Sequence, residues 1–213
     1  MGDRQIISVG SFCIASGLIE AGGQSQPSYP FDDMFSDIRM VTQALGDRFA
    51  VFLDADDYIA GHSEKVWVQR RYREDYGQAE TFVHHDMSLP ENRAAYRRRA
   101  DRLMALTETD NPLFFYIQYA DRRPPADMLL DLRRALTEHF GKSHLLVVFT
   151  GEPSPGDEER ADAKARGITI RYHKNEGRVG GTGFEKAEDN WAVIGMIRET
   201  LAATELPEKA AVG

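Results

Sequence analysis

The sequence predicts an α/β fold, a single open and mainly parallel sheet with helices on both faces. The first observation is a set of short, mainly apolar runs typical of buried strands, at residues 5–9, 113–117, 145–149 and 168–172. The second is that segments with the apolar spacing of helices separate most of these runs. Apolar strands that alternate with helices indicate a parallel sheet covered on both faces.

The first half of the chain is expected to contain three helices. The first follows the opening strand and stops at Gly22 and Gly23. The second covers residues 37–49, whose apolar residues share one face. The third covers residues 89–106, with a proline in the first turn, where its missing N–H costs nothing. A short strand is expected at residues 66–68.

The second half is expected to add a helix at residues 125–140, a polar helix at 158–166 and a last helix at 188–203. The apolar side chains expected to face inward from the last helix are Trp191, Ile194, Ile197 and Leu201. The glycine-rich residues 179–183 are expected to form a flexible loop. We expect one domain over residues 1–204 and a frayed tail over residues 205–213.

Composition narrows the class of protein. The formal net charge of −8 argues against a nucleic-acid partner. The single cysteine rules out an internal disulfide and fits a reducing compartment. The sequence has no signal-peptide pattern and no apolar window long enough for a membrane helix, so we expect a cytoplasmic protein without a membrane span. The oligomeric state does not follow from the sequence.

The cysteine, Cys13, is expected where the first strand turns into the first helix. The first N–H groups of a helix lack intrahelical partners, and the helix dipole is positive there. Both effects favour the reactive thiolate, and together with a nearby histidine they predict a lowered thiol pKa. The alternative is a buried cysteine that only fills space, since free cysteine is among the most buried residue types.

A reactive cysteine needs a base. Two adjacent histidines, His84 and His85, precede Asp86 at an expected strand end. Asp32, in an apolar segment, is an alternative acid that could orient the base, or it caps a turn. The two histidines could also be an ordinary loop pair. No second cluster with ligand spacing accompanies them, so no metal site is predicted.

The densest basic patch consists of Arg97, Arg98, Arg99 and Arg102. It could be a solvated helix face that pairs locally with Asp101. As a binding site it would hold phosphate, for example that of coenzyme A, and Arg97, Arg98 and Arg102 are the candidates.

Four segments in this order resemble the bacterial family of putative papain-like cysteine peptidases: Ser8-Val9-Gly10-Ser11-Phe12-Cys13, Tyr29-Pro30-Phe31-Asp32, Phe82-Val83-His84-His85-Asp86, and Tyr96-Arg97-Arg98-Arg99 with Arg102. The matches span roughly residues 5–120. One position departs from the family, which usually has tryptophan after Pro-Phe-Asp, where this chain has Asp33. The resemblance implies that Cys13 is a nucleophile.

The opening is also similar to the domain family named for a Gly-Ser-Cys-Phe-Ala motif, which is related to SGNH hydrolases and acyltransferases. This resemblance implies an SGNH- or flavodoxin-like sheet. In that family the nucleophile follows the first strand of an α/β sheet, whereas papain carries its cysteine on a long helix of a two-part fold. SGNH enzymes normally have Asp-x-x-His near the C-terminus. This chain has Asp189-Asn190-Trp191-Ala192 there, so the base must come from elsewhere.

These observations predict a cysteine-nucleophile acyl-transfer enzyme. Cys13 would attack a carbonyl, His85 would move the proton, and Asp86 or Asp32 would orient the imidazole, with His84 as the alternative base. The expected oxyanion and substrate contacts come from Gly10, Ser11, Phe12 and Ile14.

The acceptor and the substrate class remain open between three interpretations. With water as acceptor, the protein is a peptidase or related hydrolase of a peptide or small molecule, and it needs no cofactor. With a sugar hydroxyl, it is an O-acyltransferase that modifies a surface polysaccharide, using coenzyme A as the acyl carrier. The third interpretation is a non-catalytic carbohydrate- or protein-binding module with an inert Cys13.

Overall fold

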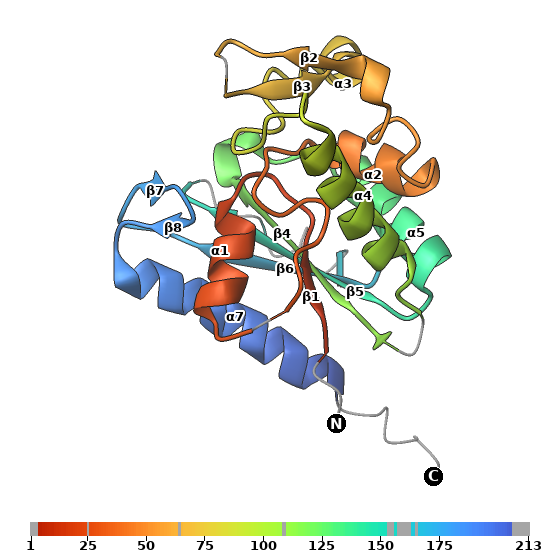
Figure 1. The fold of residues 1–213 in the computed structure, drawn as a ribbon. Helices are drawn as coiled ribbons and strands as arrows, with labels where there is room; N and C mark the ends of the chain where they lie inside the picture. The colour runs from red at the N-terminus through yellow and green to blue at the C-terminus, as the bar shows by residue number, and fades with distance from the viewer. Residues whose placement is uncertain are drawn as a thin grey trace.

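A four-stranded parallel sheet forms the centre of the molecule (Figure 1). The computed structural model describes residues 4–24, 26–63, 65–107, 110–152, 156, 163–164 and 166–205. The strands, in spatial order, are β1 (Ile6–Ser8), β4 (Leu113–Tyr119), β5 (His144–Thr150) and β6 (Ile168–His173). Every pairing is parallel, and the register aligns Ile7 with Phe114, Phe114 with Leu145, and Leu145 with Ile168. The predicted fold class, an α/β fold with a mainly parallel sheet, is confirmed.

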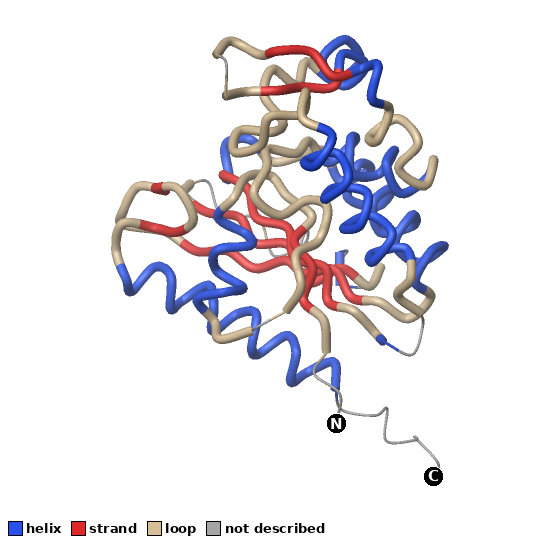
Figure 2. The backbone as a smooth tube through the Cα atoms, viewed as in Figure 1, coloured by secondary structure: helices blue, strands red, loops and turns tan. Residues whose placement is uncertain are grey.

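Two groups of helices cover the two faces of the sheet (Figure 2). α1 (Ile14–Ala21) and α7 (Ala187–Glu205) pack on one face. α2 (Ile38–Gly46), α4 (Pro90–Met104) and α5 (Ala126–Phe140) contribute to the larger apolar cluster on the other face. All five helices lie within a few residues of the predicted ranges.

The side chains of β4 explain why the strands are uninterrupted apolar runs in the sequence. Leu113, Phe115 and Ile117 join the cluster beneath α1 and α7. Phe114 and Tyr116 point to the opposite face and join the cluster beneath α2 and α5. Because successive side chains of a strand alternate between faces and both faces are dry, no position of this strand centre is left for a solvated side chain.

A small antiparallel sheet lies apart from the main one, at the top of Figure 1. It pairs β2 (Tyr58–Ala60) with β3 (Trp67–Gln69), which confirms the short strand expected near residues 66–68. The short 3-10 turn η1 (Ala55–Asp57) leads into β2, and α3 (Arg70–Tyr76) follows β3. The fully buried side chain of Gln69 ties this unit to the core. Its amide nitrogen donates to the backbone carbonyls of Val51 and Phe52, at 2.8 Å each, and to that of Asp54 at 3.4 Å.

Residues 179–183, expected to be a flexible loop, belong to a short hairpin instead. β7 (Val179–Gly180) pairs with β8 (Gly183–Phe184), and Thr182 lies in the turn between them. The turn packs closely on α1, where a Cβ atom added to Gly17 would lie 2.0 Å from the carbonyl oxygen of Thr182. The glycines therefore permit a tight turn and a close approach rather than mobility.

Trp191 is the second departure, because its side chain is 57% exposed although it was expected to face inward. The buried side of α7 is formed by Val193, Ile194, Ile197 and Thr200. Val193 and Thr200 were not part of the predicted apolar face, and they rotate the buried stripe away from Trp191.

Two predicted segments fall largely outside the described residues: the polar helix at 158–166 and the tail at 205–213. Within the described part of the chain, no helix combines the length and apolar character needed to cross a membrane.

The contact between Gly17 and the hairpin can be tested with a matched pair of glycine-to-alanine variants. Alanine normally favours a helix by about 1 kcal/mol over glycine. Gly195→Ala in α7 places its Cβ in open space, so the free energy of unfolding should rise by about 1 kcal/mol. Gly17→Ala should instead lower it, by about 1–2 kcal/mol, because the new methyl group clashes with Thr182. Urea denaturation measures both, and equal stabilisation by the two variants would disprove the docked hairpin.

Candidate functional site

The strand β1 places Cys13 at the carboxyl edge of the sheet. Backbone pairing with β4 continues past β1: Val9 N–H donates to Phe115 at 2.9 Å, and Ser11 N–H donates to Ile117 at 3.3 Å. The chain then turns into α1, with Cys13 as the N-cap residue. The thiol makes no capping bond, so its sulfur is free to interact across the site. Cys13 thus lies at the strand-to-helix turn that the sequence predicts.

A close contact with the segment around Ser36 requires glycine at position 10. The φ of Gly10 is 109°, a value that side chains rarely permit, and a Cβ atom there would lie 2.0 Å from the Ser36 hydroxyl oxygen. The N–H of Ser36 donates to the Ser11 carbonyl at 2.9 Å. The strand end before Cys13 is therefore held from both sides, by β4 and by residue 36.

The histidine nearest the thiol is His84. Its Nε2 atom lies 3.6 Å from the sulfur of Cys13, within the looser reach expected of a cysteine–histidine pair in a free enzyme. Two backbone hydrogen bonds between Phe82 and Trp67, of 2.8 and 3.0 Å, anchor the segment that carries His84 to the small sheet. The thiol is 7% exposed, whereas the imidazole is open to solvent.

His85 and Asp86, the base and acid that the sequence favoured, have other contacts. The His85 ring packs edge-on against Tyr96, with centroids 5.4 Å apart. Burial lowers the pKa of His85, and the charge of Arg99 lowers it further. The Asp86 carboxylate accepts from the amide and hydroxyl of Ser88, at 2.8 and 2.6 Å, in the turn before α4. Adjacency in sequence suggested His85, but the loop directs His84 toward the sulfur.

The two neighbouring aspartates differ in their surroundings. Asp32 is 8% exposed, and its carboxylate accepts from the amide of Tyr29 at 2.7 Å, as the turn-capping interpretation expected. Burial raises the pKa of Asp32 to about 7. Asp33, with φ of 59°, is the carboxylate whose charge helps to raise the pKa of Cys13. The same charge opposes the lowering of the pKa of His85. The sequence analysis did not consider Asp33 as a site residue, although its departure from the family pattern marked the position.

The pKa of the Cys13 thiol is raised, not lowered as predicted. Burial is the main cause, Asp33 adds to it, and the N–H of Cys13 acts in the opposite direction. The N-terminus of α1 therefore does not outweigh the loss of water around the sulfur. At neutral pH the isolated protein holds a protonated thiol beside His84.

The predicted oxyanion donors are only partly available. The Ser11 amide and hydroxyl both donate to the Ile117 carbonyl, and the Gly10 carbonyl accepts from Ile117 N–H. Within the described part of the chain, the amides of Phe12 and Ile14 have no hydrogen-bond partner. These two N–H groups beside Cys13 are the ones that could hold a developing oxyanion.

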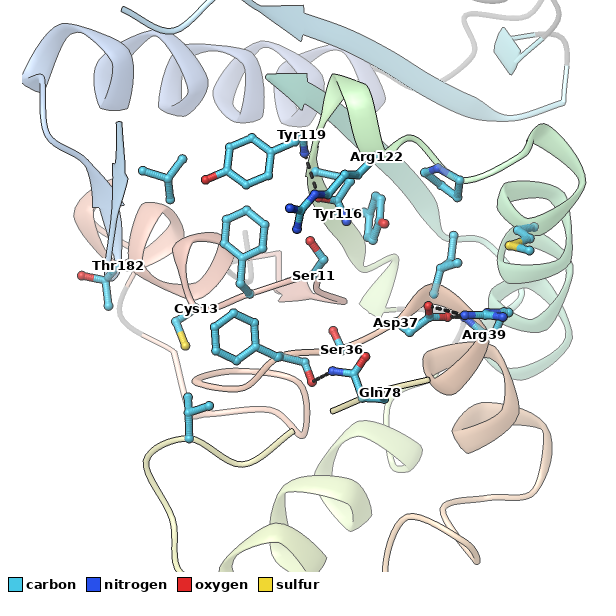
Figure 3. A pocket seen from close by; sticks show the side chains of 18 of the residues that line it. Ser11, Cys13, Ser36, Asp37, Arg39, Gln78, Tyr116, Tyr119, Arg122 and Thr182 are labelled. Atoms are coloured by element: carbon cyan, nitrogen blue, oxygen red, sulfur yellow. Dashed lines mark hydrogen bonds and ion pairs between the residues drawn. The ribbon is translucent and has the colours of Figure 1, made fainter. Parts of the chain in front are cut away.

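A cavity of about 890 Å³ opens beside Cys13 and His84 (Figure 3). Aromatic rings form much of its wall, including those of Phe12, Phe35 and Tyr119. A smaller, polar cavity of about 390 Å³ is lined by Asp32, Asp33 and Thr182, among others. Thr182 borders both cavities.

The arginines of α4 do not gather at the thiol. Arg97 and Arg98 are exposed, and Arg102 donates to the carbonyl of Ser28. The Arg99 guanidinium lies over the ring of Tyr96, 5.0 Å from its centroid. Among the residues that line the two cavities just described, none is an arginine of this patch. In the described ranges no cluster of three or more potential ligands could hold a metal ion.

Asp189, the acid without a histidine three residues later, pairs with a different histidine. His173 Nε2 lies 2.8 Å from its carboxylate, which also accepts the amides of Glu176 and Gly177. Burial opposes ionisation of Asp189, but the Gly177 amide and His173 outweigh it and hold the pKa of the carboxyl below its usual value. These bonds hold the segment between β6 and α7 in place rather than orient a base for Cys13.

Comparison with known proteins identifies a related family. A family model described as "putative papain-like cysteine peptidase" matches residues 4–149, a range that includes Cys13, Asp33 and His84. No curated protein and no solved structure matches the chain significantly.

The influence of Asp33 on the thiol predicts the effect of Asp33→Asn. Removal of the negative charge should lower the pKa of Cys13, so alkylation by iodoacetamide at pH 7.5 should become about three- to tenfold faster. The pH profile of the rate should shift to lower pH. Glu74→Gln, which removes a charge from exposed α3, is the control and should change neither rate nor profile. An unchanged rate in Asp33→Asn would contradict the electrostatic role.

Buried Asp32 predicts a pH-dependent stability. Its folded pKa of about 7 exceeds the unfolded value of about 3.9, so the folded state binds the extra proton and loses stability as pH rises through that window. Asp32→Asn keeps an acceptor for the Tyr29 amide without the charge. Its free energy of unfolding should exceed that of the parent by about 1–3 kcal/mol at pH 8, and by much less at pH 4. Urea denaturation at both pH values measures this, and a difference independent of pH would refute it.

Proposed function

The chain belongs to the family of putative papain-like cysteine peptidases, and we propose that it is a thiol hydrolase in which Cys13 is the nucleophile and His84 the base. The observation that carries this proposal is the 3.6 Å separation of the Cys13 sulfur and His84 Nε2 at the mouth of the large cavity. A nucleophile and base in mutual reach, open to a cavity, are the minimum that acyl transfer requires.

The first half-reaction acylates the cysteine. His84 Nε2 takes the thiol proton as the Cys13 sulfur attacks the acyl carbon, and the new S–C bond forms a tetrahedral intermediate. The oxyanion lies against the free amides of Phe12 and Ile14. The intermediate collapses when the bond to the leaving group breaks, and His84 returns its proton to that group.

The second half-reaction releases the acid. Water replaces the leaving group beside His84, which removes a proton as the water oxygen attacks the thioester carbon. The S–C bond then breaks, and the sulfur recovers the proton from His84. Because the free thiol has a raised pKa, proton removal accompanies attack instead of preceding it.

Water is the acceptor that we favour over a sugar hydroxyl. An O-acyltransferase that uses acyl coenzyme A would need cationic side chains for the phosphates of the carrier. The proposed phosphate-binding residues, Arg97, Arg98 and Arg102, line neither the large nor the small cavity among the described residues. The large cavity has one unpaired arginine among those residues, Arg122, which is too few for the three phosphates of coenzyme A. A binding module remains the alternative from another class, and it requires that Cys13 does not turn over.

Hydrolysis of p-nitrophenyl acetate tests the proposal. Cys13→Ala should abolish release of nitrophenol, and His84→Ala should reduce kcat/KM by about 10²–10⁴-fold, the range expected for loss of a catalytic base. His85→Ala should be mild, because its ring packs against Tyr96. His62→Ala, at an exposed histidine paired with Glu80, is the control.

A denaturing mass spectrum taken during turnover should show one acetyl group on Cys13. Full hydrolysis by Cys13→Ala would refute the enzyme and leave the binding module. A severe loss in His85→Ala with a mild one in His84→Ala would reverse the assignment of the base.

A further inference from the structure

Much of the wall of the large cavity is apolar. The ring of Phe12, next to Cys13 in sequence, stacks on Tyr119 with centroids 5.3 Å apart, and Phe35 lies 6.5 Å from Phe12. Ile38, Met128 and Val179 extend the lining. Such a surface gains stability by excluding water from an apolar group bound against it.

Most of the polar groups in this lining are already satisfied within the protein. Arg39 makes two 2.8 Å bonds to the carboxylate of Asp37 and a third, of 3.0 Å, to the carbonyl of Tyr76. Asp37 also caps α2 through the Arg39 amide. The Gln78 side chain donates to the Phe35 carbonyl at 3.2 Å, and that of Gln118 accepts from the Tyr119 amide at 2.8 Å. These groups have little bonding capacity left for a ligand.

Arg122 is the charged side chain of this lining that has no partner among the described residues, and the buried Ser36 hydroxyl also lacks one. It ends the 3-10 turn η3 (Ala120–Arg122), which directly follows β4 at the carboxyl edge of the sheet. It is exposed, lines the cavity, and makes no hydrogen bond or ion pair with any described residue. Its charge opposes the rise that burial causes in the pKa of Tyr119, so the guanidinium lies close to that ring. Figure 3 shows Arg122 beside Tyr119 and apart from Cys13.

We propose that the acyl group accepted by Cys13 has an apolar body and a distal carboxylate, which Arg122 binds. The apolar body would lie on the rings of Phe12 and Tyr119, and the carboxylate would meet the guanidinium where those rings end. An arginine fork matches a carboxylate in a bidentate geometry, and no other charge of the lining is unpaired apart from His84 if protonated. This assignment rests on the proposed hydrolase and names its substrate class.

Matched esters test the acyl preference. The p-nitrophenyl half-esters of succinic, adipic and suberic acid carry a distal carboxylate, and the butanoate, hexanoate and octanoate esters have the same lengths without the charge. At the best length, kcat/KM should be about tenfold higher for the half-ester than for its neutral counterpart. Arg122→Gln should abolish this preference by lowering kcat/KM for the half-ester to about the value of the neutral ester. Arg122→Lys, which keeps the charge without the fork, should retain part of it.

The control is Arg70→Gln, which removes a positive charge from exposed α3 and should preserve the preference. Salt should weaken the preference of the parent, because the guanidinium is exposed. Equal turnover of charged and neutral esters at every length would overturn the assignment, as would a preference that survives Arg122→Gln. A loss of equal size in Arg70→Gln would show that net charge, not Arg122, selects the substrate, and would overturn it too.

A binding measurement separates this inference from the proposed function. Cys13→Ala protein should bind suberamate about tenfold more tightly than octanamide by titration calorimetry, and the double variant with Arg122→Gln should not. If Cys13→Ala still hydrolyses the esters, the hydrolase proposal fails, and the calorimetry still decides the role of Arg122. If turnover depends on Cys13 but suberamate has no advantage, only the acyl assignment fails.

Discussion

The candidate site depends on the close approach of two backbone segments at Gly10. Three hydrogen bonds between residues 9–11 and β4 extend the parallel pairing beyond β1, and the Ser36 hydroxyl fills the space where any other residue would carry a Cβ atom. With that strand end held on two sides, α1 begins at a fixed point and in a fixed direction. The position of the thiol at the sheet edge is therefore a consequence of main-chain geometry rather than of a bond made by the sulfur.

The electrostatics around the thiol favour a neutral resting state. Burial and Asp33 both act against the thiolate, and burial with Arg99 acts against a charged His85. In the proposed reaction, proton transfer to His84 therefore accompanies the attack of the sulfur on the substrate. A protonated, largely buried sulfur is also a poor target for oxidants and electrophiles, which limits side reactions.

Periodicity was sufficient to predict the sheet, the parallel direction of its strands and the five main helices. Both faces of the sheet are dry, and each helix has one apolar side. The turn from β1 into α1 at Cys13 followed from the same pattern. The direction in which the side chains of a loop point could not be predicted. His84 and His85 are equivalent in sequence, and only the bridge between Phe82 and Trp67 decides which imidazole meets the sulfur. The raised thiol pKa depends on burial and on Asp33, neither of which a strand-to-helix pattern reveals. The tight packing of Thr182 on Gly17 likewise joins segments far apart in the chain.

The turn of the hairpin β7–β8 borders two cavities, since Thr182 forms part of the wall of both, and Cys13 lines the larger of the two. Cys13 and His84 lie inside the range that matches the family, residues 4–149, whereas the hairpin lies beyond it. Cys13 and His84 are thus encoded in a different stretch of the chain from the turn that borders both cavities. A change in the hairpin turn can reshape the walls of these cavities while the sulfur and the imidazole stay where they are, so what the cavities admit can vary independently of the chemistry proposed for the thiol.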